Sequence, residues 1–505
     1  MLWCEDTNKQ SKKLKKLGNT LKKVLLCIDY WLLDLLFCLI RHYSRPIINN
    51  CNRMEIVLLS GGSGKRLWPL SNGTRLKQFL QLLHRPDGQK ESMVQRVVRQ
   101  INEAELASSI TIVACATQRD SIESQLDANV KMVTEPENRD TFPAIALAAA
   151  HLAMERGCSR DEVVVAMPCD AYTENAYFDS VRTMVSLIED DVTELVMMGI
   201  APTNPSTKYG YIVPAMSNEP NSTYRLVQQF VEKPHKKKAK ELLAKQALWN
   251  SGVFVFRLGY IIDLLGKYIQ TTSYAEVCRR YAELPKTSFD YEVAEKATSA
   301  AMVLYEGQWK DLGTWEALTK ELPVTVMGNV VMGAETKNTT VINELGLPVV
   351  CDGISDAVVI AGHDGILVCR KGDSEHIKRY VEPLNHRPMY EERRWGTYRV
   401  LDDTCYATGE HALTKSITLK PGKHISYQIH HHRSEVWTFV EGEGLFVLNG
   451  VMRKVKAGDT VVIPVEHYHA IKALTELTFI EVQAGHPLIE EDIERFDWDW
   501  SQYVE

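Results

Sequence analysis

The chain has 505 residues, of which 45% are hydrophobic and 24% charged, and its formal net charge is −7. This composition is ordinary for globular proteins and excludes a globally disordered, collagenous or coiled-coil chain. At about 150 residues per domain, the length predicts about three domains with sizeable cores. Because the chain is mildly acidic, it is a poor candidate for a protein whose main task is gripping nucleic acid, and we expect no such partner.

The eleven cysteines are scattered along the chain without any C-x-x-C pair. This pattern predicts neither a disulfide framework nor a zinc ribbon, and it favours a reducing compartment. We therefore expect a cytoplasmic protein.

Residues 1–53 differ from the rest of the chain. They carry ten Lys and Arg against four Asp and Glu, and their apolar run "VLLCIDYWLLDLLFCLI" is interrupted by Asp29 and Asp34. A membrane-spanning helix needs about 20 apolar residues with few or no charges, so we do not expect this run to span a membrane. Two interpretations stay open: an amphipathic segment at an anionic membrane surface, or an extension that is poorly ordered or not native. We favour the second, because Met54 directly precedes a strand-like run.

Residues 54–323 alternate between strand-like and helix-like segments. Apolar runs at 55–59, 110–116, 162–170 and 194–200 predict strands, and residues 142–155 predict a helix. This alternation predicts a mostly parallel sheet with helices on both faces, which binds ligands beyond the carboxyl ends of its strands. Asp170 lies at such an end, where an aspartate serves either as a helix N-cap or as a metal ligand.

The glycine-rich turn "SGGSGKRLWPLS" follows the first strand. Gly61, Gly62 and Gly64 would let backbone N–H groups approach an anion closely, and Lys65 and Arg66 add positive charge. The spacing matches neither G-x-x-x-x-G-K-[ST] nor G-x-G-x-x-G. The turn is therefore either a phosphate loop of another kind or an ordinary strand–helix loop.

An ordered set of strings between residues 57 and 315 is much more specific than any one of them. The strings are "LLSGGSGKRLWPLS", "LKQFLQL", "RDTFPAIALAA", "MPCDAY", "YGYI", "FVEKP", "WNSGVFVF", "FDYEVAEK" and "WKDLGTW". This set resembles the sugar-phosphate nucleotidyltransferases, specifically the long, two-part bacterial mannose-1-phosphate guanylyltransferases. The resemblance implies an α/β fold with a Rossmann-like, mostly parallel sheet. It also implies an enzyme that transfers GMP from GTP to mannose 1-phosphate, giving GDP-mannose and pyrophosphate, and a homo-oligomeric assembly.

The resemblance also implies roles for individual residues. Two polyanions repel each other by several kcal/mol at intermediate dielectric, so such a site needs cations and in-line positioning. The implied catalytic residues are Arg66, Lys77 and Asp170. The implied nucleotide-binding residues are Gly61, Gly62, Gly64, Lys65 and Arg66, the sugar-phosphate-binding residues are Gly210, Glu232, Lys233 and Asn250, and the Mg²⁺ ligands are Asp170 and Asp311.

Two positions depart from the family pattern. Ala171 stands where the family commonly has His, and "DTFPAI" from Asp140 stands where "NTAPAI" is common. The second segment lies near the nucleotide base in the family, so strict selection of guanine stays an open question.

The last third of the chain is rich in short strand-like runs. Residues 324–385 predict a small β-rich connector. Residues 386–505 predict a small antiparallel barrel and resemble the isomerase-like cupin that is fused to this class of guanylyltransferase. Alternation along a strand places His430 and His432 on one face. With Gln428, Glu435 and His469 they form a candidate set of ligands for a divalent metal such as Zn, Fe, Mn or Ni; the alternative is an empty barrel with histidines as polar packing groups.

Whether the cupin isomerises mannose 6-phosphate is left open by the sequence. Such a reaction needs a general base and electrophilic stabilisation. Members with both activities commonly have Glu-His-Trp where this chain has Glu435-Val436-Trp437, so an imidazole is missing. A third hypothesis is a non-catalytic sugar-nucleotide sensor, whose mark would be loss of the loop glycines, Lys77 or the Asp pair. All of these are present.

Overall fold

The computed structural model describes residues 54–62, 65–106, 109–216, 223–384, 386–489 and 492–502. The chain divides into residues 1–52 and residues 53–505, and all described residues belong to the second unit. The expectations for residues 1–53 and for Gly64 therefore lie outside the described residues. Within the described ranges, no helix is both long and apolar enough to cross a membrane.

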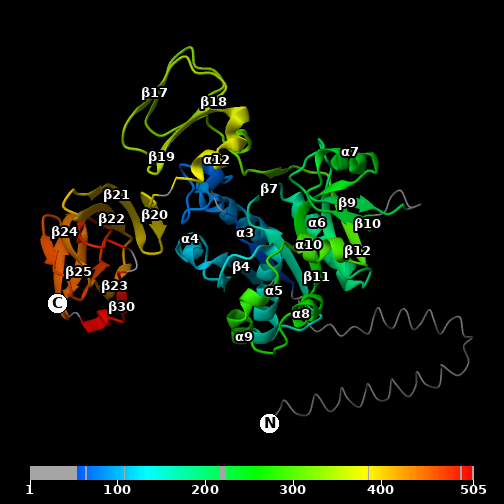
Figure 1. The fold of residues 1–505 in the computed structure, drawn as a ribbon, viewed down its shortest axis with the longest axis horizontal. Helices are drawn as coiled ribbons and strands as arrows, with labels where there is room; N and C mark the ends of the chain where they lie inside the picture. Colours follow the sequence, from blue (N-terminus) through cyan, green and yellow to red (C-terminus); the bar gives the residue numbers. More distant parts are fainter. Residues whose placement is uncertain are drawn as a thin grey trace, which may run out of the picture. The chain divides into compact units, whose positions relative to one another are not determined.

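A nine-stranded sheet organises the first domain, in the order β5-β4-β1-β6-β11-β8-β12-β10-β9 (Figure 1). As predicted, β1, β4 and β6 are parallel, and β5, which the sequence analysis did not identify, is parallel to β4. In contrast, β11 runs antiparallel between β6 and β8, so the sheet is mixed. The strands are β1 (Glu55–Leu59), β4 (Ser109–Cys115), β5 (Val130–Glu135), β6 (Val163–Pro168), β8 (Leu195–Ile200), β9 (Tyr211–Pro214), β10 (Arg225–Val231), β11 (Leu248–Arg257) and β12 (Ala300–Tyr305).

Helices cover both faces of this sheet. They are α3 (Met93–Glu103), α4 (Arg119–Gln125), α5 (Thr141–Ala150), α6 (Ala176–Glu189), α7 (Lys236–Ala244), α8 (Leu258–Gly266), α9 (Tyr274–Arg279) and α10 (Phe289–Glu292). The helix α11 (Trp315–Thr319) instead packs with connector residues such as Val358 and Ile360. A short hairpin of β2 (Leu83–His84) and β3 (Lys90–Glu91) precedes α3. The α/β class expected from the alternation is confirmed.

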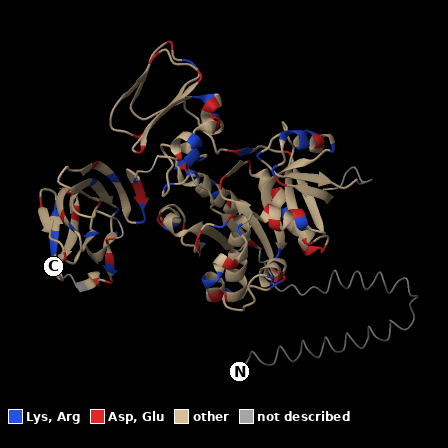
Figure 2. Ribbon diagram, in the orientation of Figure 1, with Lys and Arg blue, Asp and Glu red and all other residues tan. Residues whose placement is uncertain are grey.

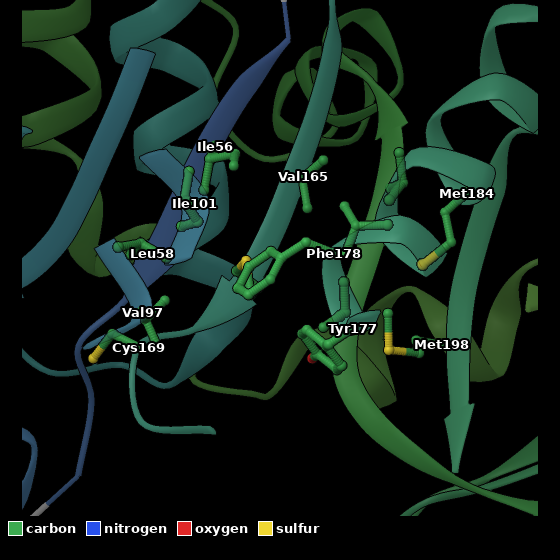
Figure 3. Packing of buried hydrophobic residues seen from close by; sticks show 14 of the residues in the cluster. Ile56, Leu58, Val97, Ile101, Val165, Cys169, Tyr177, Phe178, Met184 and Met198 are labelled. Carbon is green, nitrogen blue, oxygen red and sulfur yellow. The ribbon is translucent and has the colours of Figure 1, made fainter. Parts of the chain in front are cut away.

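The two faces of β1 lie in different hydrophobic clusters, as the period of two requires. Ile56 and Leu58 pack with residues of α3 and α6, whereas Val57 packs with α5 and α8. Figure 3 shows Val97 and Ile101 of α3 pointing towards this side of β1. Burial on both faces explains why β1 has a continuous apolar sequence.

The connector consists of short, mostly parallel strands. It contains β14 (Val326–Met327), β15 (Val330–Met332), β16 (Thr340–Asn343), β17 (Val349–Cys351), β18 (Ala357–Gly362), β19 (Gly365–Arg370) and the helix α12 (Lys378–Val381). β14, β16 and β18 pair in parallel, as do β15 and β17, and β19 is antiparallel to β18.

Two antiparallel sheets form the C-terminal barrel, as predicted. Their orders are β20-β21-β22-β29-β24-β27 and β26-β25-β28-β23-β30. Large side chains such as Trp437, Phe446 and Phe479 fill the space between them. The strands are β20 (Tyr390–Arg393), β21 (Gly396–Cys405), β22 (His411–Leu419), β23 (His424–Ile429), β24 (Arg433–Glu441), β25 (Glu443–Leu448), β26 (Val451–Lys456), β27 (Thr460–Ile463), β28 (His469–Ala473), β29 (Leu477–Gly485) and β30 (Glu494–Phe496).

Positive and negative residues are interspersed along the described elements (Figure 2).

Candidate active site and metal centre

A cavity of about 870 Å³ opens at the carboxyl ends of β1, β4, β5 and β6. This is the edge at which open α/β sheets bind ligands. Most of the residues predicted for the transferase site line this one cavity: Gly61, Gly62, Lys77, Asp170, Gly210, Glu232, Lys233, Asn250 and Asp311.

Lys77 joins the two carboxylates that the sequence predicts as metal ligands. Its Nζ lies 2.6 Å from Asp170 Oδ2 and 3.4 Å from Asp311 Oδ1. Asp311 reaches this place because β13 (Trp309–Asp311) pairs with β7 (Ala171–Thr173), with Asp311 opposite Ala171. Burial opposes the charge of Lys77, but the two carboxylates outweigh it and hold the pKa of Lys77 above its ordinary value. A positive charge is thus fixed between two oxygen donors.

The two cations of the glycine-rich turn do not line the cavity. Lys65 Nζ donates to the main-chain carbonyl of Glu382, at 3.4 Å, and the Arg66 side chain is exposed. Burial and Asp311 raise the pKa of Tyr209, a cavity residue, to about 12, while Lys77 and Arg66 oppose that rise. Arg66 therefore lies close enough for its charge to act on the cavity.

Gly210 and Glu232 form the tightest part of the cavity wall. A Cβ atom added to Gly210 would lie 2.5 Å from Glu232 Oε2, so a larger residue there would force the Glu232 carboxylate to move. Within the described part of the chain, Glu232 Oε2 is buried without a hydrogen-bond partner. A buried carboxylate oxygen without a partner is costly, so this atom is suited to accept hydrogen bonds from a ligand.

Three further groups surround Glu232. Lys233 Nζ lies 2.7 Å from Glu232 Oε1. Burial lowers the pKa of Lys233, but the contact with Glu232 outweighs it and the net shift is upward. Asn250 accepts from the Gly252 N–H through Oδ1 and donates from Nδ2 to Asp290 Oδ1 at 2.7 Å. Burial, and after it the charge of Glu232, raise the pKa of Asp290 to about 7.

The barrel interior holds a second cluster. The side chains of His430, Glu435 and His469 are almost fully buried, and each offers a ligand atom within 4.8 Å of the others. The Gln428 amide nitrogen lies 3.3 Å from His430 Nε2 and 3.4 Å from His469 Nε2. Four of the five predicted metal ligands therefore meet at one point.

The hydrogen bonds of the two histidines fix which ring nitrogen faces the cluster. His430 Nδ1 bonds the carbonyl of Asp492 at 2.5 Å, and His469 Nδ1 bonds the carbonyl of His467 at 3.0 Å. A carbonyl only accepts, so both Nδ1 atoms carry protons and both Nε2 lone pairs point inward. Burial lowers the pKa of His430 to about 4, which keeps it neutral. Two imidazole lone pairs and a carboxylate are a donor set that fits a divalent transition metal.

His432 does not join this cluster. The strand β23 ends at Ile429, so the alternation that would align His430 with His432 stops before either residue. Instead, His432 Nδ1 lies 3.2 Å from Asp492 Oδ1, with more than half of its side chain exposed. In its place the structure brings Arg433, whose Nε donates to Glu435 Oε1 at 3.0 Å.

Family models and curated relatives agree with this arrangement of two sites. The model "Nucleotidyl transferase" matches residues 55–325, and "Mannose-6-phosphate isomerase C-terminal" matches residues 381–498. The mannose-1-phosphate guanylyltransferase of Escherichia coli strain K12 is 32% identical over 488 residues, which cover 88% of this chain and 98% of that relative. The chain belongs to the mannose-1-phosphate guanylyltransferase family.

Two further comparisons agree with this family assignment. The alginate biosynthesis protein AlgA of Pseudomonas putida is 31% identical, covering 87% of this chain and 95% of that protein. A crystal structure from Thermus thermophilus, described as a mannose-1-phosphate geranyltransferase, is 29% identical, with a TM-score of 0.52 over 66% of this chain and 98% of that one. Nucleotidyltransferase and isomerase chemistry of these kinds commonly uses divalent metal ions.

Sequence analysis missed two residues of these sites. Asp290 lies within the string "FDYEVAEK", but a carboxylate in a helix-like string gives no sign that it will face Glu232 from a distant element. Arg433 follows three histidines and precedes an inward-facing glutamate at 435. Arg433 and Glu435 are two residues apart on a strand, so they share a face. That spacing could have indicated that Arg433 also faces the barrel interior.

Proposed function

We propose that the cavity of the first domain transfers GMP from GTP to mannose 1-phosphate, giving GDP-mannose and pyrophosphate. The observation that carries this proposal is the position of Lys77 between Asp170 and Asp311, in the same cavity as Lys233. Two phosphoesters must approach each other there, and a fixed arrangement of charge lowers their repulsion without reorganisation during the reaction.

Mg²⁺ is the ion that we propose for Asp170 and Asp311. Two carboxylates that already share one cation are hard oxygen donors of the type that Mg²⁺ prefers. When bound, the ion would supply positive charge to the phosphate oxygens. Lys77 lies in the same cavity and would contribute its own positive charge to the phosphate groups.

The reaction is an in-line displacement. A phosphate oxygen of mannose 1-phosphate forms a bond to the α-phosphorus of GTP, and the bond from that phosphorus to the bridging oxygen of the β-phosphate breaks, so that pyrophosphate leaves. No covalent intermediate with the chain is needed, and catalysis rests on positioning and charge. Lys77 faces the reacting phosphates, Gly61 and Gly62 offer backbone N–H groups to the triphosphate, and Arg66 adds charge at the mouth.

The sugar is held by the far wall of the cavity. Lys233 is placed to pair with the sugar phosphate, since its charge is maintained beside Glu232. The unpartnered Glu232 Oε2 and the amide of Asn250 are placed to bind sugar hydroxyls. Gly210 leaves room for the ring to approach.

A pyrophosphate-release screen of the purified full-length chain tests this proposal. Mannose 1-phosphate and glucose 1-phosphate are each combined with GTP, ATP, UTP or dTTP, with and without Mg²⁺. The proposal expects the largest kcat/KM for GTP with mannose 1-phosphate, and no turnover without a divalent ion. Faster release with glucose 1-phosphate, or full activity in a chelator, would contradict it.

We propose isomerisation of mannose 6-phosphate and fructose 6-phosphate as a second activity, located in the barrel. The observation that favours it is that His430, His469 and Glu435 point to one place in the barrel. Both histidines carry their proton on Nδ1, which leaves the Nε2 lone pairs free to bind a metal. Val436, which stands where an imidazole is common, lies on the outward face of β24. Its side chain is directed away from this cluster, so the missing imidazole does not weaken the cluster.

The isomerase proposal is tested on the full-length chain with fructose 6-phosphate in a coupled assay, after reconstitution with Zn²⁺, Mn²⁺, Co²⁺ or Ni²⁺. Metal-dependent formation of mannose 6-phosphate that His469→Ala abolishes and His432→Ala leaves intact would support it. A lack of turnover with every metal, in a protein that binds metal at this cluster, would refute it.

A further inference from the structure

Lys77 is carried by a segment with little regular structure of its own. We call residues 72–79 the Lys77 segment. Within it, the single-turn 3-10 helix Lys77–Phe79 is preceded by Leu76 and followed by Leu80, both in extended conformation. A turn this short has few hydrogen bonds of its own. Contacts with other elements must therefore fix the direction of the Lys77 side chain.

Arg75, two residues before Lys77, is buried among groups from the connector and the barrel. Its Nη1 and Nη2 atoms donate to the two carboxylate oxygens of Glu344 in the connector, at 2.9 and 3.2 Å. Its Nε lies 3.3 Å from Glu392 Oε1, and its guanidinium lies over the Tyr390 ring, 5.2 Å from the centroid. Glu392 and Tyr390 belong to β20, the first strand of the barrel. A guanidinium paired in this planar, bidentate way has a well-defined position.

The other end of the Lys77 segment is tied to the same carboxylate. Gln125 of α4 donates from Nε2 to the main-chain carbonyl of Phe79 at 2.9 Å and to Glu392 Oε2 at 3.4 Å. Glu392 therefore contacts Arg75 with one oxygen, and with the other it contacts the side chain that holds Phe79. Lys77 lies midway in sequence between these two attachments.

A second group of contacts joins this part of the barrel to α4 without involving the Lys77 segment. Arg393 Nη1 lies 2.9 Å from Asp120 Oδ2, and Arg394 Nη1 lies 3.7 Å from Glu123 Oε2. Attachment of the barrel to α4 can therefore be weakened while Glu392 and its contacts are kept. This separates a general effect of the attachment from a specific effect on Lys77.

We propose that Glu392 is a positioning residue for guanylyl transfer, which acts on Lys77 through Arg75 and Gln125. This inference rests on the proposed function of the cavity. Lys77 Nζ lies 2.6 and 3.4 Å from its two carboxylate partners, and a displacement of about 1 Å at a reacting centre can lower a rate by about 10²-fold. The barrel thus supplies part of the support of the transferase site in addition to its own cluster.

Loss of the Glu392 carboxylate should leave the chain folded. Arg75 retains Glu344 as a bidentate partner, so its buried charge stays balanced. Gln125 retains its hydrogen bond to the Phe79 carbonyl. The Lys77 segment should therefore become less rigid without unfolding.

Steady-state kinetics of the full-length chain are the first test. Glu392→Ala should lower kcat for guanylyl transfer about tenfold, because Lys77 is then less well placed. KM for mannose 1-phosphate should stay within about twofold, since its proposed contacts lie on the Gly210 wall. The matched control is Asp120→Asn, which removes the charge that Arg393 contacts, and it should leave both quantities within about twofold of wild type.

Arg75→Lys tests the same support from the other side. An ammonium group cannot pair with Glu344 through two parallel bonds and contact Glu392 at the same time, so this variant should also lower kcat. The double variant Arg75→Lys/Glu392→Ala should be no slower than the slower single variant, because both changes remove one shared contact. Multiplied effects would show that the two residues act independently and would overturn the proposal.

Amide hydrogen exchange supplies a readout that does not depend on the reaction. The N–H groups of Phe79 and Leu80 donate to the carbonyls of Leu76 and Lys77. These amides should exchange at least about tenfold faster in Glu392→Ala than in wild type, whereas those of β4 should not change. Unchanged exchange in Glu392→Ala, or faster exchange with unaltered kcat, would overturn the proposal. Faster exchange in a chain whose wild type transfers no GMP would refute the proposed function instead, and would leave the support of Lys77 by Glu392 in place.

Discussion

Lys77 Nζ lies 2.6 Å from Asp170 Oδ2, closer than it lies to Asp311 Oδ1 at 3.4 Å. The ammonium group thus occupies the space between two carboxylates to which we assign Mg²⁺. Lys77 contacts one oxygen of each carboxylate, so its positive charge opposes the binding of a second cation to the same pair. This relationship makes the roles of Lys77 and the metal separable by experiment.

Replacing Lys77 should have opposite effects on turnover and on metal binding. Lys77→Ala removes a charge that faces the phosphates, so kcat should fall by at least ~10². It also removes the competitor for Asp170, so Mg²⁺ should bind more tightly in calorimetric titrations without substrate. Lys320→Ala, at an exposed lysine just after α11, is the control and should change neither quantity. Weaker Mg²⁺ binding by Lys77→Ala would argue against this competition.

Removal of the Asp170 carboxylate should weaken the dependence of turnover on Mg²⁺. Asp170→Ala is expected to lower kcat by at least ~10² and to weaken the Mg²⁺ dependence of pyrophosphate release. Asp179→Ala, at an exposed aspartate of α6, is the matched control and should behave like wild type. Near-normal rates in Asp170→Ala, with a normal far-ultraviolet circular dichroism spectrum, would remove Asp170 from the proposed mechanism.

Gly210→Ala should damage sugar binding more than chemistry. The added Cβ would lie 2.5 Å from Glu232 Oε2 and 2.8 Å from the Phe230 ring, so the Glu232 carboxylate must move. We expect KM for mannose 1-phosphate to rise about tenfold, equivalent to about 1.4 kcal/mol, while KM for GTP stays within about twofold. Gly266→Ala, where nothing lies within 4 Å of the added atom, is the control. Equal increases in both KM values would contradict the assignment of this wall to the sugar.

Asp290 should make the stability of the first domain depend on pH. Its pKa in the folded state is raised to about 7, by burial first and by Glu232 second. The folded state therefore holds a proton that the unfolded chain releases near pH 4, and the free energy of unfolding should fall as the pH rises from about 4 to 7. Asp290→Asn removes this titration, so the variant should gain stability relative to wild type across that window.

Thermal unfolding at several pH values measures this difference between Asp290→Asn and wild type. Asp179→Asn serves as the control and should show no such trend. If the stability of Asp290→Asn relative to wild type instead fell as the pH rises, Asp290 would not be the source of the pH dependence.

The barrel histidines provide a test of metal binding that is independent of either activity. We expect elemental analysis to detect a transition metal in the wild-type chain and much less in His430→Ala and in His469→Ala, because each variant removes an inward Nε2 lone pair. His432→Ala should retain it, since His432 is directed to Asp492 outside the cluster. Chelation should lower the unfolding temperature of the wild type and of His432→Ala only. Retention of metal by both cluster variants would exclude this site.

Much of the site could be predicted because strand ends and motif order fix it. The carboxyl end of β6 presents Asp170, and the string "WKDLGTW", which contains Asp311, supplies the second carboxylate through an antiparallel pairing of β13 with β7. The direction of β11 was not predictable from the alternation, because pairing depends on the excursion through β9 and β10 that precedes it.

Other features depended on where an element ends. His432 was placed with His430 by alternation, but β23 stops at Ile429 and the chain turns. Val436 shows the opposite case, since Glu435 and Trp437 are both buried and the residue between them must be directed outward. The outward direction of Val436 could therefore be predicted from the sequence, whereas the end of β23 at Ile429 could not, because it depends on tertiary packing.

The most direct test of the account is ³¹P nuclear magnetic resonance of the full-length chain with GTP, mannose 1-phosphate and Mg²⁺. We predict that the wild type and the double variant His430→Ala/His469→Ala each form a sugar nucleotide and pyrophosphate in a one-to-one ratio, seen as their diphosphate signals. The double variant Asp170→Ala/Asp311→Ala should form neither product. Product formation by the aspartate double variant, or its loss in the histidine double variant, would contradict the assignment of the transfer to the cavity that Lys77, Asp170 and Asp311 share.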